Sequence, residues 1–355
     1  AFARSTAEGR FDAAFLAALA LEELGALDTD QRALLLQFRS VAPVRARDTL
    51  DAAAWDLLRV PAANHALAGL LRVVARSAMA ARLDQLVDRR RLVQLDPAGR
   101  LDQASTASVV RSFQWSARVL GTVCPALYVV PEVPGEIAAV RGQEPTTAVG
   151  PSVVSGRSAK DLAFLAGRHL TYYLPEHHVV VYYPTEDDLS QLVLAAAQLA
   201  GRVPEAVAGS RDVAALCARL RHALGEREHA ALAEAVSQLP VGSETVDLTD
   251  WARGVELTAG RAGLFLCGDL AAAIAVLRSE SRSLAGLTFE EKRADLIAFC
   301  ASPAHAALRE RFAVTEAQGG PSSEPPRSTD RPGMPPEWHA SGAQHPAGTR
   351  RPDVS

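Results

Sequence analysis

The sequence predicts a mostly helical α+β protein, in which a helical N-terminal region precedes a domain with a small sheet. Along most of the chain, apolar residues recur at i, i+3 and i+4 spacing, which is typical of amphipathic helices. Between residues 126 and 154, this pattern gives way to short β-branched runs separated by Pro and Gly. With 355 residues, the chain is long enough to bury a full core.

Residues 1–121 are expected to form the helical region. Short helices joined by turns indicate helical hairpins, such as the end of a helical-repeat array, although no regular period is found. Because residue 1 is Ala and not Met, we expect the chain to be part of a longer protein. The helices that the apolar periodicity predicts in this region are 11–24, 31–38, 50–58, 66–86 and 105–120.

Residues 122–315 are expected to form the second domain, which begins with three short strands at 126–130, 137–140 and 148–154. A Pro- and Gly-containing turn separates each strand from the next. The remaining residues, 316–355, are rich in Pro and Gly, and they are expected to be a disordered tail.

A long helix is expected from Ser158 to Tyr173, because Ser158 and Asp161 have the spacing of a capping box. The run 178–183 is rich in Val and Tyr, so it is expected to be extended. The rest of this domain returns to helical periodicity. The helices that it predicts are 186–200, 209–224, 226–238, 249–278, 288–300 and 302–312.

Composition excludes several classes of protein. A net charge of −4 argues against a polybasic nucleic-acid binder, so no nucleic-acid partner is expected. The most apolar stretch, 261–278, contains Asp269 and is too short to span a bilayer, so no integral membrane segment is expected. The four cysteines lack paired spacing and are expected to be free thiols. The start of the chain does not determine a compartment, and we favour the cytoplasm.

Four stretches resemble segments of one metallopeptidase family. They are 125–130, 137–140, 149–156 and 161–173. This part of the chain is similar to the gluzincin metallopeptidases typified by the heat-shock protease HtpX and the CAAX prenyl protease. The resemblance implies a zincin-like domain, in which 137–140 is the edge strand beside the substrate and 161–173 is the active-site helix.

The family has an H-E-x-x-H motif on that helix, and here the five positions read Arg168-His169-Leu-Thr-Tyr172. Two His residues four positions apart share one helix face and can bind one zinc ion, and the Glu activates the metal-bound water. Arg168 and Tyr172 occupy the two ligand positions, and His169 occupies that of the catalytic Glu. A guanidinium has no lone pair for a metal and would repel Zn²⁺. The metal site is therefore expected to be lost.

The third ligand of the family is a Glu on a later helix, and Glu256 matches that position. The Asp that follows it in the family is replaced by Gly260. If the fold is retained, Arg168 and Glu256 are expected to face each other and form an ion pair where the metal would bind. In the other interpretation, Glu256 is still a metal ligand and is helped by nearby His or Tyr side chains.

Four of the five tyrosines lie close to this position in the sequence. For Tyr173, Tyr182 and Tyr183, two roles remain open. They could form a surface that contacts a peptide or protein, or they could pack between the helix and the following segment. His169 is expected to be a packed core histidine, whereas His177 and His178 would point to opposite sides of an extended chain.

These patterns predict a catalytically inactive metallopeptidase-like domain that acts as a protein-interaction or scaffolding module of a larger protein. No cofactor and no catalytic residue are expected, and the partner would be a protein or a peptide. The alternative is a hydrolase, a metallopeptidase with an unusual metal site that uses Glu256 and nearby His or Tyr side chains. Metal content separates the two alternatives.

Overall fold

The computed structural model describes residues 2–60, 65–133, 137–203, 210–239, 247–280, 283 and 285–313. All of these residues belong to one compact unit, which lies within residues 1–316. The disordered tail that the sequence predicts at 316–355 lies outside the described residues. In the part of the chain that is described, no helix is both long and apolar enough to cross a membrane.

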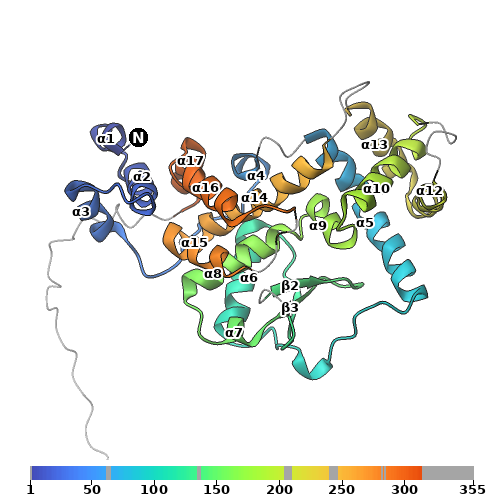
Figure 1. The fold of residues 1–355 in the computed structure, drawn as a ribbon, viewed down its shortest axis with the longest axis horizontal. Coiled ribbons are helices and arrows are strands. Elements are labelled where there is room, and N and C mark those ends of the chain that lie inside the picture. Colours follow the sequence, from blue (N-terminus) through green and yellow to red (C-terminus); the bar gives the residue numbers. More distant parts are fainter. Residues whose placement is uncertain are drawn as a thin grey trace, which may run out of the picture. The chain divides into compact units, whose positions relative to one another are not determined.

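The mostly helical α+β class is confirmed (Figure 1). The elements that precede the sheet are α1 (Phe2–Ala7), α2 (Phe11–Glu23), α3 (Thr29–Phe38), α4 (Ala52–Leu58), α5 (His65–Asp88), the 3₁₀ helix η1 (Pro97–Gly99) and α6 (Ser108–Leu120). The strands are β1 (Ala126–Val129), β2 (Ile137–Val140) and β3 (Thr146–Val149). The helices that follow are α7 (Pro151–Val154), α8 (Ala159–Thr171), α9 (Pro175–Tyr182), α10 (Glu186–Leu199), α12 (Arg211–Ala223), α13 (Glu226–Ser237), α14 (Leu248–Cys267), α15 (Leu270–Ser279), α16 (Phe289–Cys300) and α17 (Pro303–Phe312).

The three strands form one mixed sheet with the order β1-β3-β2. β3 is central and pairs in parallel with β1, with Ala126 opposite Thr146, and antiparallel with β2, with Ile137 opposite Val149. Within the described residues, no other strand pairs with β2, which therefore has one open edge. Alternate residues of such a strand direct their backbone N–H and C=O groups away from the sheet, where they can bond to another chain.

The strand expected at 148–154 is wrong in its second half. β3 ends at Val149, and Pro151 begins the short helix α7. Proline lacks an N–H and has a fixed φ near −65°, so it is accommodated at the first position of a helix and not within a central strand. The chain therefore leaves the sheet after Val149 and forms a short helix before α8 begins at Ala159.

The extended segment expected at 178–183 is also wrong, because these residues belong to helix α9 and its C-terminal cap. Pro175 occupies the first turn of α9, and Glu176 follows it at the end where a negative charge stabilises the helix. The Val-rich face of α9 packs against α5, so tertiary burial outweighs the β propensity of Val and Tyr.

The single helix expected at 249–278 is two helices. Gly268, with φ +65°, ends α14 in the left-handed conformation, and Asp269 caps α15 by accepting a hydrogen bond from the backbone N–H of Ala272. The apolar pattern continues across the break because both helices are buried, so periodicity alone did not reveal it. By contrast, the capping box of Ser158 and Asp161 is confirmed at the start of α8.

Two clusters of buried apolar side chains organise the compact unit. The first joins α2, α4 and α6 to the sheet, α8, the second half of α14 and the helices that follow. The second joins α5, α9, α10, α12 and α13 to the first half of α14. Helices on both sides of residue 121 thus share each cluster. The domain boundary expected at that residue stays a prediction.

Helices α8 and α14 pack closely because glycines face each other across their contact. A Cβ atom at Gly167 would lie 2.8 Å from Leu266 Cδ1, and one at Gly263 would lie 2.8 Å from the carbonyl oxygen of Phe164. Neither distance can be accommodated without a shift of the helices. This close contact brings the side chains of Arg168 and Glu256 within reach of each other.

Candidate functional site

Arg168 on α8 and Glu256 on α14 form the buried ion pair that the sequence predicts. Arg168 Nη2 lies 3.1 Å from Glu256 Oε1, and Arg168 Nη1 donates a hydrogen bond of 3.0 Å to the backbone carbonyl of Glu256. The two side chains are 9% and 1% exposed, respectively. Because both are almost fully buried, solvent screens the pair only weakly.

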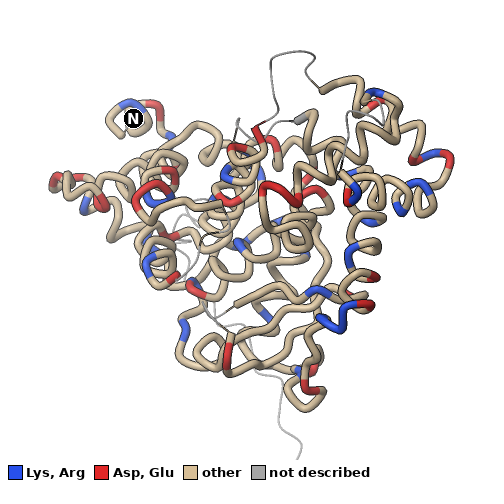
Figure 2. Tube along the Cα trace, turned by 45° about the vertical axis from the view of Figure 1, so that its right-hand side comes forward, with Lys and Arg blue, Asp and Glu red and all other residues tan. Residues whose placement is uncertain are grey.

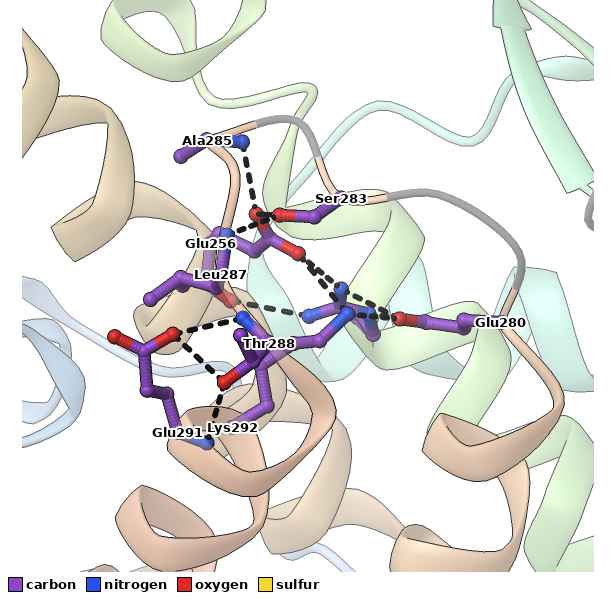
Figure 3. Close-up of polar contacts among 9 residues, drawn as sticks. Glu256, Glu280, Ser283, Ala285, Leu287, Thr288, Glu291 and Lys292 are labelled. Carbon is purple, nitrogen blue, oxygen red and sulfur yellow. Dashed lines mark hydrogen bonds and ion pairs between the residues drawn. The ribbon is translucent and has the colours of Figure 1, made fainter.

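Glu280 and Lys292 extend this pair into a cluster of four charged residues (Figure 3). Arg168 donates to both carboxylate oxygens of Glu280, from Nε at 2.6 Å and from Nη2 at 3.0 Å. Lys292 Nζ lies 2.9 Å from Glu280 Oε2 and 3.3 Å from Glu256 Oε1. Two positive and two negative charges balance, so burial of this charge cluster leaves no net charge in the interior.

The second carboxylate oxygen of Glu256 is also bonded. Oε2 accepts hydrogen bonds from the hydroxyl of Ser283 at 2.7 Å and from the backbone N–H of Ala285 at 3.0 Å (Figure 3). Both oxygens of Glu256 are thus held by protein donors. A metal ion at Glu256 would have to replace several of these contacts.

The charge states of the cluster follow from this arrangement. Burial would raise the pKa of Glu256, but the positive charge of Arg168 and the hydrogen bond from Ser283 outweigh it, so the pKa lies below its usual value. Burial opposes the charge of Arg168, yet the neighbouring Tyr172, Glu280 and Glu256 raise its pKa above the ordinary value. Both side chains are therefore ionised at neutral pH.

His169, which follows Arg168 on α8, is a buried histidine bonded to the sheet. Its Nε2 lies 2.9 Å from the hydroxyl oxygen of Thr147, and that oxygen lies 2.7 Å from the hydroxyl of Tyr173. Since the Tyr173 hydroxyl donates to the carbonyl of Thr146, Thr147 donates to Tyr173 and accepts from His169. Nε2 therefore carries the proton and offers no lone pair. Burial lowers the pKa of His169 to about 3.

His177 and His178 do not point to opposite sides of an extended chain, as expected, because they are neighbours on helix α9. Nδ1 of His177 donates to the carbonyl of Thr171, and Nδ1 of His178 donates to that of Tyr172. Both rings are buried. In the described part of the chain, no group of three or more His, Cys, Asp or Glu side chains is arranged to hold a metal ion.

A cavity of about 550 Å³ adjoins the charge cluster. Arg168, His169 and Tyr172 of α8 line it on one side, and the whole of β2 lines it on another. The segment 91–95, which follows α5, forms a further wall. The cavity is thus lined both by the edge strand β2 and by the helix that carries Arg168.

Tyr172, the C-terminal cap of α8, lines this cavity and has a free polar group. Its ring is 7% exposed, and its hydroxyl has no hydrogen-bond partner among the described residues. Burial raises the pKa of this hydroxyl, so it stays protonated and can donate a hydrogen bond.

The structure places Tyr173, Tyr182 and Tyr183 in the interior, at 7%, 3% and 3% exposure. Their hydroxyls donate to the backbone carbonyls of Thr146, Gly142 and Ala78, respectively. Of the two roles left open by the sequence, these contacts match packing between α9, the sheet and α5. None of these three rings presents a surface to solvent.

Sequence reasoning missed Glu280 and Lys292. A signal was available for Lys292, because the chain has 37 basic residues and uses Lys only at positions 160 and 292. Both lysines form ion pairs that are largely buried, Lys160 with Asp269 at 2.7 Å and Lys292 within the charge cluster. Glu280 carries no comparable signal, since it follows α15 as an ordinary polar residue after an apolar helix.

Comparisons of the chain with protein-family models, with curated proteins and with solved structures found no match.

Proposed function

We propose that this chain is a catalytically inactive metallopeptidase-like domain that binds an extended segment of a protein or peptide, as an interaction or scaffolding module of a larger protein. One observation carries the proposal: the former metal-ligand positions are joined in a charge-balanced cluster, while the cavity beside them and the edge strand that lines it are open. The resemblance to gluzincins supplies the class of ligand.

The proposed binding mode uses the free backbone groups of β2. An extended peptide can add to an open strand edge through main-chain hydrogen bonds, and pockets beside the edge then select its side chains. All four residues of β2 line the cavity, so a peptide on this edge would direct alternate side chains into it. The hydroxyl of Tyr172 adds one donor for a peptide carbonyl.

Hydrolysis is not part of the proposal, because the side chains at the catalytic positions cannot perform it. Arg168 is held by two carboxylates and has no lone pair. His169 is neutral and donates its Nε2 proton to Thr147, so that nitrogen cannot accept a proton from water.

The proposed binding is tested with a capped, uncharged peptide of alternating Val and Ser, acetyl-(Val-Ser)₃-amide, by isothermal titration calorimetry. We expect the full chain to bind it. Ala138 on β2 and its cross-strand neighbour Ala148 both line the cavity, so the variant Ala138→Phe should fill the site and abolish binding. The control Ala214→Phe changes an exposed residue of α12 and should leave binding intact.

Failure of the full chain to bind this peptide, or equal binding by the Ala138→Phe variant, would contradict the proposed function. Circular dichroism and thermal unfolding are used to check that both variants are folded.

A further inference from the structure

The walls of the cavity are aliphatic over most of their surface. Leu92, Val93 and Leu95 contribute from the segment after α5, Leu165 contributes from α8, and Val180 contributes from α9. Such walls favour apolar side chains of a ligand, because burying them removes hydrophobic surface from water. They do not distinguish a peptide of one charge from a peptide of another.

The charged residues of the lining can distinguish an acidic peptide from a basic one. Among the described residues, five charged side chains line the cavity, of which Arg168, Glu256 and Glu280 belong to the charge cluster and are balanced within it. The other two are Arg91 and Arg141. The described part of the lining therefore has two positive charges without a counterpart.

Arg141 directly follows β2 and is partly buried. Its Nε donates a hydrogen bond of 2.6 Å to the backbone carbonyl of Val181, which fixes the guanidinium beside the cavity. Among the described residues, no carboxylate forms an ion pair with it. Asp188 is close enough to influence Arg141, but that carboxylate is bonded to Arg82 at 2.7 Å.

The surroundings of Arg141 disfavour its charge. Burial and the nearby positive charge of Arg82 lower the pKa of Arg141. A ligand carboxylate beside the guanidinium would reverse this effect by supplying the missing negative charge. The protein thus provides the guanidinium of Arg141 as a donor, and the ligand would provide the carboxylate that accepts from it.

Arg91 also lines the cavity, at the end of a run of three arginines that follows α5. Basic residues gather at this end of α5 (Figure 2). Arg91 is exposed and has no ion-pair partner in the described part of the chain. Together, Arg91 and Arg141 bring positive charge to the same apolar cavity from two different segments of the chain.

From this arrangement, we infer that the extended segment bound in the cavity is acidic: its apolar side chains fill the aliphatic walls, and its Asp or Glu carboxylates pair with Arg141 and Arg91. The inference rests on the proposed function. A fatty acid also combines an apolar chain with a carboxylate, but the open edge of β2 along the cavity offers backbone bonds that a peptide can use and a fatty acid cannot.

The test compares three capped hexapeptides, acetyl-(Val-Glu)₃-amide, acetyl-(Val-Ser)₃-amide and acetyl-(Val-Lys)₃-amide, by isothermal titration calorimetry with the full chain. Since the ends are blocked, only side chains differ in charge. We expect the acidic peptide to bind about tenfold more tightly than the uncharged one, as for a charge-assisted hydrogen bond. The basic peptide should bind more weakly than both.

The variants Arg141→Gln and Arg91→Gln should each remove most of the preference for the acidic peptide and leave the affinity for (Val-Ser)₃ unchanged within twofold. The control Arg111→Gln makes the same change of charge at an exposed site on α6 that does not line the cavity, and it should retain the preference. Arg91 is exposed, so its variant remains informative if Arg141→Gln fails to fold.

Equal binding of the acidic and uncharged peptides would overturn the inference and leave the proposed function standing. Loss of all peptide binding would overturn both. Dodecanoate serves as a competitor: if it binds more tightly than (Val-Glu)₃ and depends on Arg141, the cavity is a fatty-acid site and the inference is wrong.

Discussion

Replacing Arg168 by Leu is expected to lower the free energy of unfolding by about 3 kcal/mol, because it leaves the buried carboxylates of Glu256 and Glu280 without their shared partner. The second change, Glu256→Gln, removes one of these carboxylates. In the double variant, the loss should be smaller than the sum of the two single losses, with a coupling of about 1–2 kcal/mol. Urea unfolding of the four proteins measures this cycle.

The matched control is Arg76→Leu, which breaks an ion pair with Glu228 on the surface, where the arginine side chain is 88% exposed. Screening by water makes such a pair weak, so little change in the free energy of unfolding is expected. If Arg168→Leu and Glu256→Gln are additive, or if the effect of Arg168→Leu is as small as that of the control, the charge cluster does not contribute as the structure indicates.

The stability of the protein is expected to fall between pH 6.5 and pH 5 because several histidines are buried in the neutral form. Burial lowers the pKa of His169 to about 3, that of His177 to about 4 and that of His305 to about 3. In the unfolded chain, these side chains take up protons below pH 6.5, whereas in the folded chain they do not. Protonation therefore favours unfolding, and stability is fully present only above pH 6.5.

Each of these histidines can contribute up to about 1.4 kcal/mol per pH unit in this range. Protonation of the buried glutamates lowers stability only at more acidic pH, because the pKa of Glu256 and that of Glu176 lie below the ordinary value of 4.5. Urea unfolding at pH 7.5, 6.5 and 5.5 separates the two effects. A free energy of unfolding that stays constant over this range, or histidine NMR titrations near pH 6.5 in the folded state, would contradict the prediction.

The residues predicted best from the sequence are those whose partners were implied by helix spacing. Arg168 and Glu256 were placed together by aligning two helices on one family, and the structure joins them at 3.1 Å. The same alignment could not supply Glu280 or Lys292, because Glu280 follows α15 and Lys292 lies on α16, outside the segments compared. A cluster built from four separate places along the chain depends on how the chain folds back, which local spacing does not encode.

The segment 175–183 shows where local propensity was misleading. Its Val and Tyr residues favour a strand, but Pro175 starts a helix that is buried against α5. The change has consequences for the site, since Tyr182 then bonds to Gly142 just beyond β2, and Val180 and Val181 become walls of the cavity. The cavity itself was therefore not predictable from the sequence.

Metal content tests the central claim most directly. When the full chain is purified from zinc-supplemented medium without chelators and dialysed against a weak chelator, elemental analysis should find far less than one zinc per chain. The expectation follows from the positive charge of Arg168 beside Glu256, which would repel Zn²⁺, and from the bonds that occupy both oxygens of Glu256. Near-equimolar zinc that survives the dialysis would contradict the account and favour a metallopeptidase with an unusual metal site.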